Sequence, residues 1–387
     1  MLSSQWLERD FGGQVVPERP LYLHQEQAVI RAVAERRNLV VATGTGSGKT
    51  ESFLIPIIEE LFRQQQKGVL GPGVRALLLY PMNALANDQL KRLRMLLARS
   101  PEITFGRYTG ETPQTRADGI AALHASLPDA AVLPNELLGR EEMQERPPHI
   151  LLTNYAMLEY LLLRPADSPL FEPSGDHGWR FIVLDEVHSY DGAMGLENGM
   201  LLRRLRDRVG RAVGDVQAIA TSATVGGIDD QPIVAQFAQD LFDLPFEWDG
   251  VDPARQDVIV AARQAPVMPP VGHPVDLPAA IADGDDSSAE ALVSDGRVQA
   301  LLQSLWQGPM TLQQVAEDIS NPPDPMLAGN LVRRLSSLND PASGVPFLRA
   351  RFHTFVRAPD GVDVCLRIHA DGAPRAFLEP SVTPGVW

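Results

Sequence analysis

The chain has 387 residues, enough for two or more domains that each bury a core. Its net charge of -15 argues against a surface covered with nucleic-acid-binding basic groups, although screening over roughly 10 Å still permits a local basic groove. No apolar run reaches the ~18 residues needed to cross a bilayer. The N-terminus lacks a signal-peptide pattern, and the single cysteine, Cys365, rules out an internal disulfide. We therefore predict a cytoplasmic protein with no membrane segment.

Short apolar runs alternate with helical stretches from residue 21 to residue 244. The runs are Asn38–Val41, Ala76–Tyr80, His149–Thr153, Phe181–Leu184 and Val216–Ala220. Each run is almost continuously apolar and is bounded by turns or polar residues, as parallel strands are when helices cover both faces of their sheet. We therefore predict an α/β domain with a parallel sheet, preceded by an N-terminal arm over residues 1–20.

The stretch after the first apolar run has the pattern of a phosphate-binding loop. Its residues are Ala42, Thr43, Gly44, Thr45, Gly46, Ser47, Gly48, Lys49 and Thr50. In such a loop, backbone N–H groups and the N-terminus of the following helix face the anion. Lys49 would reach the outer phosphates, and the Thr50 hydroxyl would hold Mg²⁺. The pattern predicts that the chain binds a nucleoside triphosphate; a structural glycine-rich turn is the less favoured alternative.

An acidic pair follows the apolar run Phe181–Leu184. Asp185 and Glu186 would lie at the carboxyl end of this strand, on the edge of the sheet where the phosphate loop opens. Asp185 can then position Mg²⁺, and Glu186 can orient or deprotonate an attacking water. Without the phosphate loop, a solvated acidic pair at a strand end would be an equally good interpretation.

A group of small hydroxyl residues follows the run Val216–Ala220. Ser222 and Thr224 lie at a neighbouring strand end, where they could bond to His188 and sense the outer phosphate. Taken alone, this tripeptide pattern has no functional meaning.

Together, these segments resemble the motifs of superfamily 2 helicases of the DEAD/DEAH-box type. Thr43–Thr50 is similar to motif I, Asp185–His188 to motif II in its DEVH form, and Ser222–Thr224 to motif III. Upstream, Tyr22 and Gln25 resemble the element that recognises adenine in this family. The resemblance covers roughly residues 20–245, and it implies a RecA-like domain that binds ATP and Mg²⁺.

Three further segments fall in the family's order. Tyr80–Gln89 resembles motif Ia, Tyr108–Thr112 resembles motif Ib, and Thr153–Leu158 resembles a later strand-contacting motif. The resemblance implies that these segments contact a nucleic-acid backbone, and hydroxyl, amide and backbone donors suit phosphate oxygens. The expected contact residues are Pro81, Asn83, Thr109, Gly110, Thr153 and Asn154.

A narrower resemblance rests on the amino-acid sequences of three segments. Residues 77–89, 185–192 and 351–357 are similar to bacterial DNA helicases of the mitomycin-repair-factor and Lhr-like kind, and to helicase components of phage-defence systems. The resemblance implies DNA as the nucleic acid, with an RNA helicase as the less favoured alternative. The zinc cluster of those relatives does not carry over, because Cys365 is the single cysteine; a small core residue is its simpler interpretation.

The pattern changes after residue 244. Prolines and an acidic run over 245–296 predict a linker or an irregular insertion. A winged-helix-like α+β module is predicted over 297–387, with the start of another domain as the alternative. Its expected helices are Arg297–Trp306, Thr311–Ile319 and Met326–Leu338, and its expected strands are Val345–Leu348, Arg351–Arg357 and Val362–Ile368.

A second RecA-like domain is not evident after Thr224. Superfamily 2 motors use such a domain to supply an arginine finger, which can raise the rate by 10³–10⁵. We therefore expect this chain to be the ATP-binding half of a motor, weakly active alone and completed by a partner chain or by a further part of the protein. An ATP-binding regulatory or nucleic-acid-binding subunit without hydrolysis of its own is the alternative.

Overall fold

The computed structural model describes residues 21–44, 47–172, 178–190, 192–223, 230–261, 269–282, 286–307, 310–339, 347–348, 364–368 and 374–378. The chain divides into two units, Met1–Arg263 and Gln264–Trp387. The predicted N-terminal arm lies outside the described residues. Within them, no helix is both long enough and apolar enough to cross a bilayer.

The first unit is built on an eight-stranded sheet in which every neighbouring pair of strands is parallel. The strand order is β4-β3-β5-β2-β6-β7-β1-β8. The strands are β1 (Leu39–Ala42), β2 (Ala76–Tyr80), β3 (Phe105–Arg107), β4 (Glu136–Leu137), β5 (Ile150–Asn154), β6 (Phe181–Leu184), β7 (Gln217–Ser222) and β8 (Val258–Val260). The predicted α/β fold is therefore confirmed.

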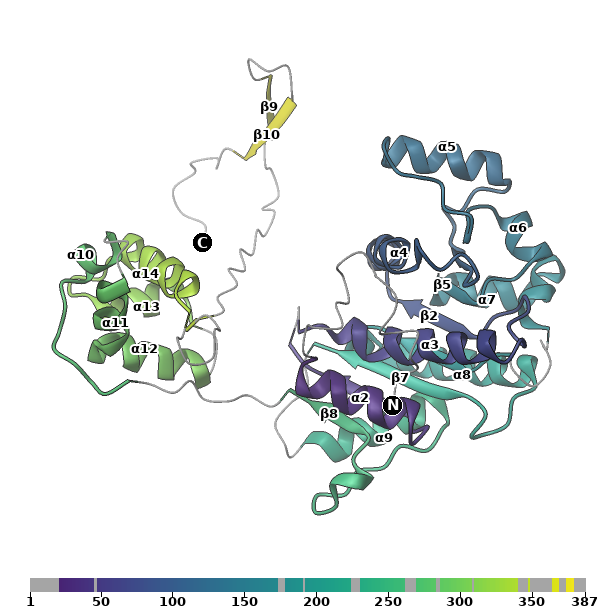
Figure 1. Ribbon diagram of the computed structural model, residues 1–387, viewed down its shortest axis with the longest axis horizontal. Helices are drawn as coiled ribbons and strands as arrows, with labels where there is room; N and C mark the ends of the chain where they lie inside the picture. The colour runs from purple at the N-terminus through teal and green to yellow at the C-terminus, as the bar shows by residue number, and fades with distance from the viewer. Residues whose placement is uncertain are drawn as a thin grey trace. The chain divides into compact units, whose positions relative to one another are not determined.

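Helices cover both faces of this sheet (Figure 1). On one face, Ala76, Leu78 and Tyr80 of β2 pack in a core with α2 (Leu23–Val33), α3 (Lys49–Gln66) and α4 (Asn83–Leu97). On the other face, Leu77 and Leu79 share a core with α7 (Tyr155–Leu163), α8 (Gly192–Val209) and α9 (Gln231–Phe242). Because alternate residues of β2 are buried on opposite faces, the strand is apolar throughout.

Shorter elements complete the first unit. They are helices α5 (Arg116–Ser126) and α6 (Arg140–Glu145) and 3-10 helices η1 (Pro165–Phe171), η3 (Val187–Ser189) and η5 (Pro253–Arg255). Among the strands, β3, β4 and β8 are absent from the prediction. They have two or three residues each, too few to give a recognisable apolar run.

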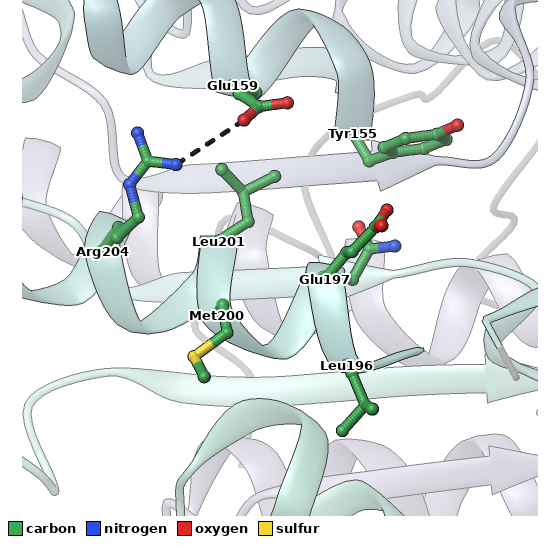
Figure 2. Close-up of a pocket in the computed structure, with 8 residues that line it drawn as sticks. Tyr155, Glu159, Leu196, Glu197, Met200, Leu201 and Arg204 are labelled. Atoms are coloured by element: carbon green, nitrogen blue, oxygen red, sulfur yellow. Dashed lines mark ion pairs between the residues drawn. The ribbon is translucent and has the colours of Figure 1, made fainter. Parts of the chain in front are cut away.

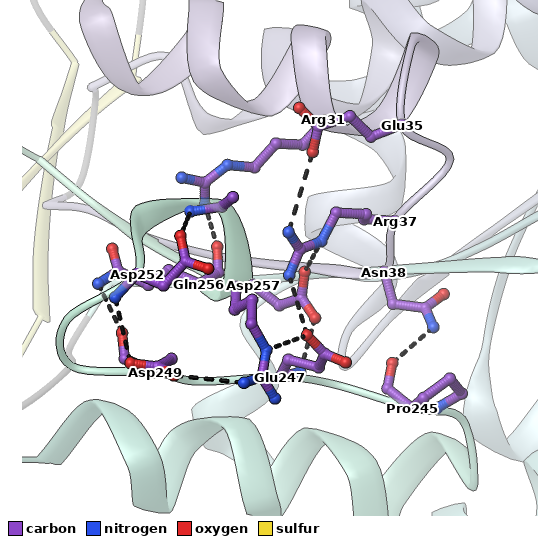
Figure 3. A network of polar contacts seen from close by, with 12 residues as sticks. Arg31, Glu35, Arg37, Asn38, Pro245, Glu247, Asp249, Asp252, Gln256 and Asp257 are labelled. Carbon is purple, nitrogen blue, oxygen red and sulfur yellow. Dashed lines mark hydrogen bonds and ion pairs between the residues drawn. The ribbon is translucent and has the colours of Figure 1, made fainter.

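A network of polar contacts joins the residues before β8 to the start of the sheet (Figure 3). Arg37 Nε donates to Asp257 Oδ1 at 2.7 Å, and Asn38 Nδ2 donates to the Pro245 carbonyl at 2.8 Å. Val258 to Val260 then pair with β1. The predicted linker therefore starts too early, because a strand and its buried ion pair place residues 245–261 in the first unit.

The second unit contains five helices among its described residues. They are α10 (Leu277–Ala282), α11 (Asp286–Ser294), α12 (Gly296–Gln307), α13 (Leu312–Ile319) and α14 (Pro325–Ser337). The last three correspond to the predicted helices, and Thr311 caps α13 by accepting the Gln314 N–H at 3.2 Å. Part of the predicted irregular segment is helical instead, as α10 and α11.

An antiparallel pair, β9 (Val364–Ile368) and β10 (Pro374–Leu378), lies near the end of the chain. The predicted strand Val362–Ile368 overlaps β9, whereas β10 was not predicted. The predicted strand Arg351–Arg357 lies outside the described residues, and the described part of Val345–Leu348 is not a strand. The winged-helix interpretation stays a prediction.

Candidate functional site

The loop between β1 and α3 forms a cradle at the carboxyl edge of the sheet. Gly48 precedes α3 with φ +79°, a left-handed conformation that favours glycine. A Cβ at Gly48 would lie 2.3 Å from Gln25 Nε2, so a side chain here would displace Gln25. Lys49, the first residue of α3, is only 8% exposed. Thr45 and Gly46 lie outside the described residues; Gly44 is exposed, and Ser47 N donates to its carbonyl at 3.3 Å.

Strand β6 ends at the same edge of the sheet, and the acidic pair follows it directly. In the sheet order, β7 alone separates β6 from β1, so the ends of β6 and β1 lie close together. Lys49 Nζ is 3.5 Å from Glu186 Oε1. Glu186 has φ +52°, a strained conformation for a residue with a side chain, and such strain gathers at functional sites. The structure therefore brings together the predicted phosphate-binding lysine and the predicted acidic pair.

Asp185 is buried and held by its neighbours. The Thr221 hydroxyl donates to Asp185 Oδ1, and Glu186 N donates to the same oxygen at 3.2 Å. Burial raises the pKa of the Asp185 carboxyl, and the neighbouring Glu186 carboxylate adds to the rise; the Thr221 hydroxyl and Lys49 act in the opposite direction. A buried carboxylate in this state gains from a bound divalent cation, because the cation favours its charged form.

His188 and Ser222 are in contact between the ends of β6 and β7. His188 Nδ1 lies 3.3 Å from Ser222 Oγ and 3.3 Å from Glu186 Oε2. His188 thus contacts both Glu186 and the end of β7 through the same ring nitrogen. Thr224, the other residue predicted for this role, lies outside the described residues.

The predicted adenine-recognising element packs against the cradle. Gln25 Nε2 donates to the Gly48 carbonyl at 2.9 Å, and Gln25 Oε1 accepts the Tyr22 N–H at 2.9 Å. His24, which was not among the predicted residues, contacts the Ser47 carbonyl through Nε2 at 3.0 Å and stacks on the Tyr22 ring. Gln25 therefore braces the phosphate loop directly, and Tyr22, 39% exposed, offers an aromatic surface beside it.

Two contacts between α4 and α3 were also not predicted from the sequence. Gln89 Nε2 donates to Thr50 Oγ1 at 3.4 Å, and Arg92 forms an ion pair with Glu51. Thr50 is the predicted Mg²⁺ ligand, so Gln89 orients its hydroxyl. A polar residue at the end of the motif Ia segment is the signal that could have identified this position.

Two of the predicted nucleic-acid residues, Asn83 and Asn154, are joined by a hydrogen bond at the same edge. Asn154 Nδ2, at the end of β5, donates to Asn83 Oδ1 at 2.7 Å. Asn83 Nδ2, at the start of α4, donates to Glu111 Oε1 at 3.0 Å. These side chains come from three separate motifs, and Pro81 lies partly exposed beside them.

The two predicted threonines do not present their hydroxyls to solvent. Thr153 Oγ1 donates to the Tyr108 carbonyl at 2.6 Å, and Thr109 is fully buried. The structure differs here from the prediction, because both side chains are buried and the Thr153 hydroxyl is used within the sheet. Gly110, next to Thr109, is exposed, so its backbone can still meet a ligand at this point.

A separate pocket of about 510 Å³ lies between α7 and α8 (Figure 2). The Glu159–Arg204 ion pair, at 3.7 Å, lies along one side, and Tyr155 lies on the same helix as Glu159. Leu196 and Met200 are exposed beside it. This pocket contains none of the residues predicted to bind ATP.

The cradle of β1–α3 and the acidic pair of β6 define a P-loop nucleotide-binding domain. Residues 22–230, more than half of the chain, match the family model described as DEAD/DEAH box helicase. The chain belongs to this family.

Among curated proteins, the chain is similar to Druantia protein DruE of Escherichia coli (strain UMEA 4076-1), with 35% identity over 59% of the chain and 17% of DruE. It is also similar to the ATP-dependent helicase Lhr-Core of Methanothermobacter thermautotrophicus, with 29% identity over 57% of the chain and 22% of that protein. The predicted Lhr-like resemblance is thus confirmed. The chain spans about a fifth of the length of these relatives.

Among solved structures, the DUF1998 helicase MrfA bound to DNA matches with 24% identity and a TM-score of 0.42. This match covers 62% of the chain and 27% of MrfA.

Proposed function

We propose that this chain is the ATP-binding motor half of a DNA helicase or translocase. The observation that carries the proposal is the 3.5 Å approach of Lys49 Nζ to Glu186 Oε1, with Asp185 beside them at the end of β6. One cation and two carboxylates at the mouth of a phosphate cradle are the groups that phosphoryl transfer requires.

The described residues fit ATP with Mg²⁺. The Thr50 hydroxyl and the Asp185 carboxylate supply oxygen ligands, which Mg²⁺ prefers. The bound cation would neutralise charge that develops on the phosphates. Lys49 would bind the β- and γ-phosphates, and the left-handed glycine at position 48 would let the backbone approach them.

Glu186 is placed to act on water. Its side chain is more open to solvent than that of Asp185, with 22% against 8% exposed, although its Oε2 atom is buried. The two acidic residues thus differ in environment: the buried one suits a metal ligand, and the accessible one suits orienting water and accepting its proton. When Lys49 turns to the phosphates, Glu186 loses its cation partner and is free for this role.

The contacts of His188 suit communication between the two sites. Its ring lies between Glu186 and Ser222, so a change at the outer phosphate alters its environment. Along the same edge, Asn83, Gly110 and Asn154 would contact the backbone of a DNA strand, which positions the strand without reading its sequence. A second RecA-like domain would complete both sites.

The test is a complementation assay. The chain alone should hydrolyse ATP very slowly, because the arginine finger contributes 10³–10⁵ in rate. Adding a second RecA-like domain of the same protein should produce ATPase activity that single-stranded DNA stimulates, and Glu186→Gln should abolish it. Turnover of about 1–10 s⁻¹ by the chain alone would refute the need for a second domain. DNA binding with no turnover under any condition would instead indicate a regulatory subunit, and stimulation by RNA alone would indicate an RNA helicase.

A further inference from the structure

Helix α5 contributes little to the core. It is inserted between β3 and β4, and Gly119 is its single buried residue. A surface helix ordinarily buries a stripe of apolar side chains that stabilises it. Figure 1 shows α5 at one end of the first unit, beyond α6. The helix therefore has a free face that the fold does not use.

The N-terminal half of α5 is fixed in place. A Cβ at Gly119 would lie 2.6 Å from the Leu138 carbonyl, so glycine permits the close approach. Arg116 forms an ion pair with Glu142 and donates to the Glu136 carbonyl at 3.2 Å. The C-terminal half has no comparable buried anchor and instead forms one wall of a pocket.

This pocket has a volume of about 430 Å³ and lies between α5, α4 and β4. Its size is within the range of small-molecule sites. The apolar part of its lining is formed by Leu90, Ala122, Leu123, Leu127, Leu137 and Leu138, and charged and polar residues form the rest. Such a surface suits the flat face of an aromatic ring.

Polar groups lie at defined places around this apolar interior. Arg94 and Glu136 form a buried ion pair in the lining, with side chains 11% and 1% exposed. Asn87 accepts from Arg107 through Oδ1; in the part of the chain that the structure describes, its Nδ2 makes no hydrogen bond. Lys91 is 57% exposed, and its nearest acidic partner, Asp88, is 3.6 Å away. The pocket thus combines an apolar interior with an amide donor and an accessible cation.

The pocket is continuous with the proposed DNA-binding edge. Glu111 lines it and accepts hydrogen bonds from both Arg107 and Asn83. Asn83 in turn accepts from Asn154. One chain of hydrogen bonds therefore runs from the candidate backbone-contact residues to the pocket.

We propose that this pocket receives an unpaired base of single-stranded DNA that lies along the edge of the sheet. The inference rests on the proposed function, because it requires a strand at that edge. The leucine walls hold the faces of the base, the Asn87 amide donates to its edge, and Lys91 binds the adjoining phosphate. Contacts to base faces tolerate any sequence, as a translocating protein requires.

The experiment compares two tryptophan substitutions on α5. Both Ala121 and Ala122 are exposed, but Ala122 lines the pocket and Ala121 does not. Binding of the 387-residue chain to a fluorescein-labelled thymidine oligonucleotide is measured by anisotropy. Ala122→Trp fills the pocket and should weaken binding about tenfold, the effect of losing one favourable base contact. Ala121→Trp should bind within about twofold of the original chain.

A second measurement uses the unsubstituted chain. An oligonucleotide with one 2-aminopurine, moved along the strand in steps, should show a distinct fluorescence change at one position when bound, and an abasic residue there should weaken binding. DNA binding with equal affinity in both variants and no position-dependent change would overturn the base pocket and leave the proposed function intact. Failure of the original chain to bind DNA would instead contradict both.

Discussion

Lys49, at the start of α3, and Glu186, just after β6, meet with Nζ and Oε1 3.5 Å apart. This ion pair forms between the predicted phosphate-binding residue and the predicted base. A triphosphate would compete with Glu186 for the same ammonium group. The pair therefore opposes nucleotide binding slightly while it keeps Lys49 at the mouth of the cradle.

Glu186→Gln should separate binding from hydrolysis. The amide removes the charge that competes for Lys49, so affinity for Mg²⁺–ATP should rise about two- to fivefold, the value of a partly exposed ion pair. Hydrolysis in the complete motor should be lost. A fluorescent ATP analogue measures the affinity. Glu26→Gln, on the exposed side of α2, is the control and should change neither property.

Thr221→Val should weaken the metal site. The hydroxyl donates to Asp185, and its loss raises the pKa of this carboxyl further and leaves the buried oxygen without that donor. We expect the Mg²⁺ concentration needed for half-maximal ATP binding to rise about tenfold. Ser222→Ala should leave this requirement unchanged and reduce stimulation by DNA. An unchanged Mg²⁺ requirement in Thr221→Val would remove Asp185 from the metal site.

The sequence was sufficient to locate the central strands and the residues at their ends. Ala76–Tyr80 and Phe181–Leu184 match the structure residue for residue, because strands buried on both faces are continuously apolar. Strand β8 was missed because its three residues follow a segment rich in turn formers. Its place in the sheet comes from its pairing with β1, and the Arg37–Asp257 contact beside it also joins residues far apart in the chain.

The candidate site was predictable where a residue's role follows from its position at a strand end. The meeting of Lys49 with Glu186 follows from parallel topology alone. The contacts of His24 and Gln89 did not follow, since they depend on how α2 and α4 pack against the loop and α3. The burial of Thr109 and Thr153 could not be predicted from the sequence either, because a threonine near a strand end suits either a ligand contact or a structural hydrogen bond.

Stability should depend on pH through His149. Burial, followed by the nearby charge of Arg75, lowers the pKa of His149 to about 4. Its neutral ring accepts the Thr104 N–H at 3.0 Å and contacts the Gly71 carbonyl at 3.1 Å. Because protonation favours the unfolded chain, stability present above the unfolded pKa of about 6.5 should fall by about 3 kcal/mol as pH drops to 4.

Urea denaturation at several pH values measures this dependence. His149→Gln should be less stable at pH 7.5 yet lose less stability between pH 6.5 and 4. His124→Gln, at an exposed position of α5, should retain the full pH dependence. An identical pH profile for His149→Gln would show that other groups control acid stability.

Arg37→Met should destabilise the first unit by about 3 kcal/mol, because it leaves the Asp257 carboxylate buried without its cation. Asp257 is 4% exposed, and its backbone also pairs with the sheet. Arg255→Met removes a cation that is 57% exposed and pairs with Glu247; this control should change stability by less than about 1 kcal/mol. Equal effects of the two substitutions in thermal unfolding would contradict the proposed role of the network in Figure 3.

The most direct test of the proposed nucleotide site is calorimetric titration of the chain with Mg²⁺–ATP, compared between Lys49→Ala and Lys67→Ala. Both lysines belong to the α3 region, but Lys67 is exposed at the far end of the helix, about 27 Å from Lys49. We predict one binding site in the original chain, at least tenfold weaker binding in Lys49→Ala, and unchanged binding in Lys67→Ala. Equal affinity in all three proteins would show that ATP does not bind at the cradle beside Asp185 and Glu186.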